Sequence, residues 1–140
     1  MKQAPSNLKF KKYHKASSKF LTLMEQKSFI PTRGLYALKS TDSGKLTFKH
    51  IEAGRRAIRR TIKKSGDMWI KVFTYASVSK KPTAVRMGKG KGSHSFWMCP
   101  IRPGQIIYEI GGAPVDLSIK ALRSAGTKLP FKTSIVKLIY

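Results

Sequence analysis

An excess of positive charge is the feature that most constrains how this chain folds. Its 140 residues contain 29 Lys and Arg against 6 Asp and Glu, which gives a formal net charge of +23. Repulsion within such a chain opposes compaction, and a bound polyanion relieves it most easily. The expected partner is therefore a nucleic acid, and an anionic membrane surface is the second candidate.

The chain nevertheless has the apolar content of a folded protein. Hydrophobic residues make up 41% of the sequence, so we expect one domain with a modest core and not a disordered tail. The single cysteine, Cys99, excludes an intramolecular disulfide and a Cys-based zinc cluster. No apolar run approaches the roughly 18–20 residues of a transmembrane helix. The N-terminus lacks the apolar stretch of a secretory signal, so we expect the mature chain to begin near Met1.

Composition divides the chain into an arm and a domain. Residues 1–34 hold eight cations and one acid among aromatic residues, and they predict a basic N-terminal arm. Residues 35–140 predict a single domain with a mobile loop at about 74–95. The arm cations expected to bind RNA are Lys9, Lys11, Lys12 and Lys15.

Hydrophobic spacing predicts two helices. Apolar residues recur at helical spacing from Phe48 to Ser65, with Thr47 as the N-cap and Gly66 as the C-terminal stop. A second amphipathic helix is predicted to begin at Pro114 and to end at Gly126.

Runs of β-branched and aromatic residues predict the strands. They lie at residues 35–39, 69–73, 96–99, 105–110 and 131–139. The third and fourth runs are joined by five residues and predict a hairpin, whereas residues 40–44 are typical of a turn. Pro100 indicates a bulge or an edge position. The predicted architecture is α+β, with two helices packed on a mixed or antiparallel sheet.

The first predicted helix carries six cations on one exposed face. They form two columns at a spacing of four residues, namely Arg55, Arg59 and Lys63, and Arg56, Arg60 and Lys64. A solvated surface helix usually has acids at these spacings, but here only Glu52 is available. We therefore favour a polyanion ligand over a solvated basic face. Arginine suits this role because its planar guanidinium binds phosphate bidentately and stacks on bases.

A second cationic segment without any acid follows the second predicted strand run. Its residues expected near RNA are Lys80, Lys81, Arg86, Met87, Gly88, Lys89, Gly90, Lys91 and Gly92. The glycine spacing matches neither the P-loop nor the dinucleotide fingerprint, which excludes nucleotide binding of those types. Alternating glycines let the backbone approach a ligand closely. We therefore favour a loop that inserts into nucleic acid over an idle surface loop.

Catalysis is not expected. The six acids lie singly in separate predicted elements, which leaves no pair for acid–base or two-metal chemistry. Cys99 and His94 are five residues apart, but Cys99 lies in an apolar run and is more typical of a core residue than of a nucleophile. The histidines lack metal-ligand spacing, so no metal or cofactor is expected. Trp69 and Trp97 are interpreted as core residues, with base stacking as the alternative.

Four separated motifs carry a resemblance to a known family. They are IEAGRRA at 51–57, WIKVF at 69–73, VRMGKGKG at 85–92 and PGQIIYEIGG at 103–112. In order and spacing they resemble ribosomal protein sixteen of the bacterial-type large subunit, and the similarity extends over nearly the whole chain. The resemblance implies an α+β fold and a structural, non-enzymatic role on large-subunit rRNA near the aminoacyl-tRNA site. It also implies that the Gly-Lys loop points toward the peptidyl transferase region.

The same resemblance implies the partners and a location. The expected partners are large-subunit rRNA, aminoacyl-tRNA and neighbouring large-subunit proteins, with no membrane contact and no homo-oligomer. Lys, Ile and Phe stand where bacterial members often carry Arg, Val and Ala, which favours a mitochondrial ribosome over a bacterial cytoplasm or a plastid. A second reading remains, a peripheral module that binds an anionic membrane or an acidic partner. The narrow Ile stripe of the first helix argues against it, because it suits packing on a sheet.

Overall fold

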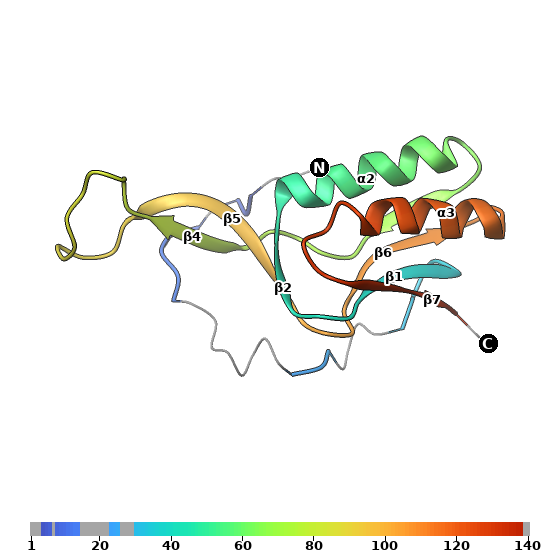
Figure 1. The fold of residues 1–140 in the computed structure, drawn as a ribbon, viewed down its shortest axis with the longest axis horizontal. Coiled ribbons are helices and arrows are strands. Elements are labelled where there is room, and N and C mark those ends of the chain that lie inside the picture. Colours follow the sequence, from blue (N-terminus) through green and yellow to red (C-terminus); the bar gives the residue numbers. More distant parts are fainter. Residues whose placement is uncertain (1–3, 7, 15–22, 26–29, 139–140) are drawn as a thin grey trace.

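The strands form two separate antiparallel sheets, and both helices lie on one of them (Figure 1). The computed structural model describes residues 4–6, 8–14, 23–25 and 30–138. The elements in chain order are β1 (Tyr36–Ser40), β2 (Gly44–Thr47), α2 (Phe48–Ile62), β3 (Asp67–Ile70), β4 (Ala76–Lys80), β5 (Ser93–Ile101), β6 (Ile106–Gly111), α3 (Val115–Gly126) and β7 (Thr133–Lys137). The predicted α+β class is confirmed, but the single sheet becomes two.

The larger sheet holds the core. Its strand order is β3-β6-β1-β7, and α2 and α3 cover one face of it (Figure 1). Leu38 of β1 pairs with Tyr108 of β6, and both side chains are fully buried on the helix side. Tyr108 also donates a hydrogen bond from its hydroxyl to the carbonyl oxygen of Ile51, at 2.8 Å. This bond fixes the first turn of α2 above the sheet.

The smaller sheet projects away from the helices. Its strand order is β2-β5-β4, and β4 and β5 form a long hairpin whose tip is the loop 81–92 (Figure 1). Strand β5 is exposed at Ser93 and buried from Cys99 to Ile101, so it runs from the tip into the core. Strand β2 pairs with the inner end of β5 and leads directly into α2.

The predicted hairpin of residues 96–99 and 105–110 is wrong, because β5 and β6 belong to different sheets. The connection between them is held by the end of β1. Gly104 donates its backbone N–H to the carbonyl of Ser40 at 2.8 Å, and Ser40 donates to Gln105 at 2.9 Å. Gly104 has a φ of +87°, which favours glycine at this bend. The path of the chain at this turn is therefore determined by residues that are distant in the sequence but close in space.

The structure also narrows the predicted loop at 74–95 and adds strand β2. Residues 76–80 and 93–95 belong to strands β4 and β5, and residues 44–47, which begin at the last residue of the predicted turn, pair with β5. Pro100 pairs with Lys45 on one side only, since the last residue of β5 that pairs with β4 is Met98. Its predicted edge position is thus confirmed locally, while the bulge lies elsewhere in β5, at Ser95, opposite Val78 and Ser79 of β4.

The ends of the helices differ slightly from the prediction. Thr47 is the N-cap of α2, as predicted, and its backbone N–H donates to His50 Nδ1 at 3.4 Å. The helix ends at Ile62, however, because Lys63 adopts a φ of +54° as the C-cap, and Gly66 is not the stop. Pro114 is the N-cap of α3 and not its first residue.

Candidate nucleic-acid interface

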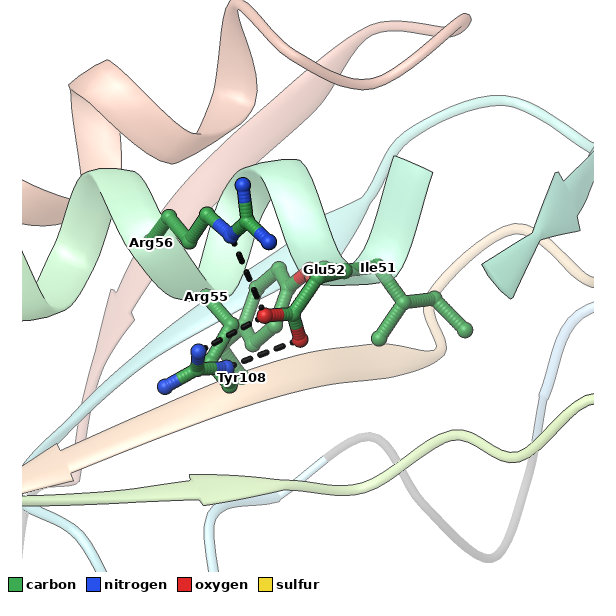
Figure 2. A network of polar contacts seen from close by, with 5 residues as sticks. All are labelled: Ile51, Glu52, Arg55, Arg56 and Tyr108. Atoms are coloured by element: carbon green, nitrogen blue, oxygen red, sulfur yellow. Dashed lines mark hydrogen bonds and ion pairs between the residues drawn. The ribbon is translucent and has the colours of Figure 1, made fainter. Parts of the chain in front are cut away.

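The exposed face of α2 carries the predicted cations, and one acid binds two of them. Glu52 accepts hydrogen bonds from Arg55 at 2.7 and 2.8 Å and from Arg56 at 3.2 Å (Figure 2). The hydrogen bonds from Arg55 are the main reason why the pKa of Glu52 falls to about 2, although partial burial opposes the shift. Glu52 therefore stays ionised and holds both guanidinium groups in place.

The other four cations of this face form no ion pair with an acid among the described residues. Arg59 and Arg60 lie on the last turn of α2 and are exposed, and Arg59 donates to the carbonyl of Gly66 at 3.4 Å. Lys63 and Lys64 are also exposed but lie beyond the helix end, so the two predicted columns stop at the arginines. Within the described part of the chain, no carboxylate forms an ion pair with any of these four. We call Arg59, Arg60, Lys63 and Lys64 the unpaired cation cluster.

The basic arm is tied to the hairpin loop. Lys12 donates from Nζ to the carbonyl of Lys91 at 3.1 Å, and Lys91 donates from Nζ to the carbonyl of Tyr13. Lys9 and Lys11 are exposed, and Nζ of Lys9 lies 5.9 Å from the centre of the Phe10 ring. The predicted contact residue Lys15 lies outside the described residues.

The loop at the hairpin tip is open and cationic. Its residues from 82 to 91 are exposed, and Met87 presents 94% of its surface to solvent. Gly88 and Gly90 have φ angles of +95° and +83°, which explains the alternating glycines, and Lys89 between them has +52°. Gly92 closes the hairpin, since a Cβ there would meet the Lys80 backbone at 2.6 Å. The predicted loop cations Arg86 and Lys89 are therefore exposed at the tip of a paired β-hairpin, whereas Lys81 donates from Nζ to the carbonyl of Gly88 and Lys91 contacts the arm.

The α2 face and the loop are separate surfaces. In Figure 1 the hairpin tip and the C-terminal end of α2 lie toward opposite ends of the molecule. The structure therefore brings Lys12 and Lys91 together, but it does not bring the loop to the unpaired cation cluster. A polyanion that meets both surfaces must extend along the molecule.

The sequence reasoning missed the role of Glu109, which fastens the end of the arm to the sheet. Glu109 is fully buried on the sheet face opposite the helices. Its carboxylate accepts backbone N–H bonds from Thr32 at 3.2 Å, Arg33 at 2.9 Å and Gly34 at 3.2 Å, and Lys71 Nζ lies 3.4 Å away. Burial alone would raise the pKa of Glu109, but these donors and Lys71 outweigh it and hold the pKa below that of an ordinary glutamate. A lone acid in an otherwise apolar strand was the available signal.

The described residues show no catalytic or metal-binding grouping. No group of three His, Cys, Asp or Glu side chains within them is arranged to hold a metal ion. Cys99 is buried, which raises the pKa of its thiol to about 11, and it is a core residue as predicted. His94 does not face it, since its Nδ1 lies 2.7 Å from Ser77 Oγ and its ring packs 4.6 Å from that of Trp97. None of the described helices is long and apolar enough to cross a membrane.

Comparison with known proteins finds similarity over most of the chain. Residues 5–136 match the family described as ribosomal protein L16p/L10e. The large ribosomal subunit protein uL16 of Pseudoalteromonas atlantica is 41% identical over 132 residues, which cover 94% of this chain and 94% of that protein. The family match includes the arm from residue 5, the α2 face and the hairpin loop.

Proposed function

Because the chain belongs to the ribosomal protein L16p/L10e family, we propose that it binds large-subunit rRNA through the arm and α2, with the β4–β5 hairpin loop close to the aminoacyl-tRNA site. Membership of this family makes it a structural, non-enzymatic constituent of the large ribosomal subunit. The finer proposal assigns the rRNA contact to the arm and α2, and assigns support of tRNA placement to the loop.

The observation that carries the rRNA proposal is the unpaired cation cluster at the end of α2. Cations near a helix C-terminus gain from the helix dipole, but that gain is only about 0.3–1 kcal/mol for each and falls off within the last turn. Four neighbouring cations repel one another, and a bound anion with several charges offsets this repulsion. A phosphate backbone supplies such charges at regular spacing.

A membrane surface fits this helix poorly. An interfacial helix must insert an apolar face into the lipid boundary. The apolar face of α2 consists of Ile51, Ile58 and Ile62, none of which exposes more than 1% of its surface. The apolar side is therefore occupied by the core, and only the cationic side is free to bind.

The rRNA proposal is tested by the salt dependence of binding. The double variant Arg59→Gln, Arg60→Gln keeps helix propensity and leaves the buried stripe intact. Against a structured fragment of large-subunit rRNA, its plot of log Kd against log salt should be flatter by about 0.7–0.9 for each lost phosphate contact. The matched control is Lys120→Gln, Arg123→Gln, which removes two exposed cations from α3. Equal slopes for the parent and the α2 variant would refute the phosphate contacts.

The loop is proposed to act later than assembly. Its support is its open cationic surface at the end of a hairpin, together with the family resemblance of VRMGKGKG. In the variant Arg86→Ser, Lys89→Ser the α2 surface is untouched, so the protein should remain at normal occupancy in purified large subunits while aminoacyl-tRNA binds more slowly. Loss of the protein from subunits would instead assign the loop to anchoring. Normal occupancy with an unchanged tRNA rate would leave the loop without the proposed role.

A mitochondrial ribosome is proposed as the location. Its support is the frequency of Lys, Ile and Phe at positions where bacterial members often carry other residues. The relative compared here is bacterial, so a bacterial cytoplasm is the competing location. Antibody detection in ribosomes sedimented from purified mitochondria of the source cells would support the proposal, and detection in cytoplasmic ribosomes alone would refute it.

A further inference from the structure

An uncovered face of the small sheet forms a groove of about 1000 Å³. The helices cover the other sheet, and this groove lies beside β2, β4 and β5. Cross-strand pairing places Val78 opposite Phe96, and Ala76 and Thr47 opposite Met98, so these side chains share one face. The arm supplies one wall through Tyr13. The volume is at the upper end of the about 300–1,000 Å³ that is usual for ligand sites.

Three aromatic rings around this groove remain about half exposed. The exposed fractions are 54% for Tyr13, 44% for Tyr75 and 43% for Phe96. These rings come from the arm, from the segment before β4 and from β5, so the fold gathers them from distant parts of the sequence. Aromatic rings left exposed on a sheet are the platform on which single-stranded RNA stacks its bases.

The charge around the groove is positive. Lys45 and Lys91 line it together with His14, and no acid is among the described residues that line it. An apolar protein segment carries no charge that two lysines could bind. A nucleotide has both a phosphate for the lysines and a flat base for the rings. The lysines suit its phosphates and the rings suit its base.

We propose that this groove binds an unpaired base of RNA, stacked on Tyr75 or Phe96 with its phosphates near Lys45 and Lys91. The proposal rests on the rRNA-binding function above and adds a second kind of contact to it. Bases within a duplex are stacked on each other and hide their faces, so a loop or bulge nucleotide is the ligand. The α2 face would then hold the RNA backbone, and the groove would select a position where a base is free.

The test uses the full chain and an eight-nucleotide oligouridylate, measured by fluorescence anisotropy. In Tyr75→Leu, Phe96→Leu the apolar volume is kept but the flat rings are lost, and affinity should fall at least about fivefold, and up to about 150-fold, for one stacked base. The slope of log Kd against log salt should not change, because stacking releases no counterions. By contrast, Lys45→Gln should lower that slope by about 0.7.

Two control variants separate stacking from damage to the fold. Phe73→Leu removes a ring of similar exposure that lies outside the groove lining, and it should bind like the parent. Tyr75→Phe keeps the ring and loses only the hydroxyl, so it should also bind like the parent. Equal weakening by Phe73→Leu, or an unchanged affinity in the double variant, would overturn the proposal.

A second probe separates this site from the wider function. If the parent binds the structured rRNA fragment with a steep salt slope while the double variant binds the oligouridylate normally, the groove fails and the rRNA function stands. If the parent binds neither RNA, both fail. If the double variant binds both RNAs normally but its large subunits lack a neighbouring protein, the groove docks protein and the proposal is overturned.

Discussion

Replacing Glu109 with Gln should loosen the end of the arm at Thr32 and destabilise the sheet. The carboxylate accepts through both oxygens, from Thr32 on Oε1 and from Arg33 and Gly34 on Oε2. An amide has one acceptor oxygen, so at least one backbone N–H must face an NH₂ group. The less costly orientation keeps the two bonds to Oε2 and loses the one from Thr32 together with the charge opposite Lys71.

The expected loss follows from these contacts. A hydrogen bond to a charged group contributes about 1.5–3 kcal/mol, and the two bonds that remain become weaker because their acceptor loses its charge. We therefore expect Glu109→Gln to lower the free energy of unfolding by about 2–4 kcal/mol at pH 7. That is a large share of the about 5–15 kcal/mol typical of a domain.

Urea unfolding and amide exchange measure this effect, and pH supplies a second check. Since these contacts hold the pKa of Glu109 in the folded protein below its value in the unfolded chain, the stabilisation is present above the unfolded pKa and is lost as pH falls through the folded pKa. The difference between the parent and Glu109→Gln should therefore shrink on acidification. A variant within about 0.5 kcal/mol of the parent, with the amide of Thr32 as well protected as in the parent, would refute the reasoning.

Three further predictions concern single positions. Glu52→Gln should lower the free energy of unfolding by less than about 1 kcal/mol in urea, because its contacts with two arginines lie at the surface. It should also steepen the salt dependence of RNA binding, measured by RNA titration, because both guanidinium groups become free to bind phosphate. Gly34→Ala should destabilise the protein by about 1–3 kcal/mol in urea unfolding, because a Cβ there lies 2.6 Å from the Ile110 carbonyl oxygen. Cys99 should react with a thiol reagent at pH 8 only as fast as the protein opens, because its buried thiol has a pKa of about 11, and rapid labelling of the folded protein would contradict this.

Local patterns predicted the helices well and the strand partners poorly. The Ile spacing of α2 was sufficient because one helix face determines which side chains are buried, and Ile51, Ile58 and Ile62 are all in the core. Strand β4 has the sequence ASVSK, whose serines and lysine carry little strand preference, and it becomes a strand through its pairing with β5. Strand pairing depends on distant partners, and no local pattern reports it.

The positions of the cations on α2 were predictable from the sequence. The end of the helix and the contacts of Glu109 were not. Helical spacing alone placed Arg55 and Arg56 near Glu52, while the helix end at Lys63 depended on its left-handed backbone. The importance of Glu109 was hidden because its donors lie 75 to 77 residues away in the sequence. The aromatic groove was hidden for the same reason, since its rings come from three separate segments.

Strand β5 connects the exposed hairpin loop to the core of the protein. Its nine residues span about 30 Å at about 3.4 Å per residue, from the exposed Ser93 beside the loop to Ile101, which is buried in the core. The buried end of β5 pairs with β2, where Leu46 lies opposite Cys99, and β2 continues without a break into α2 at Phe48. The loop is therefore linked to the start of α2 through β5 and β2, so a force applied at the loop would be transmitted to the basic helix.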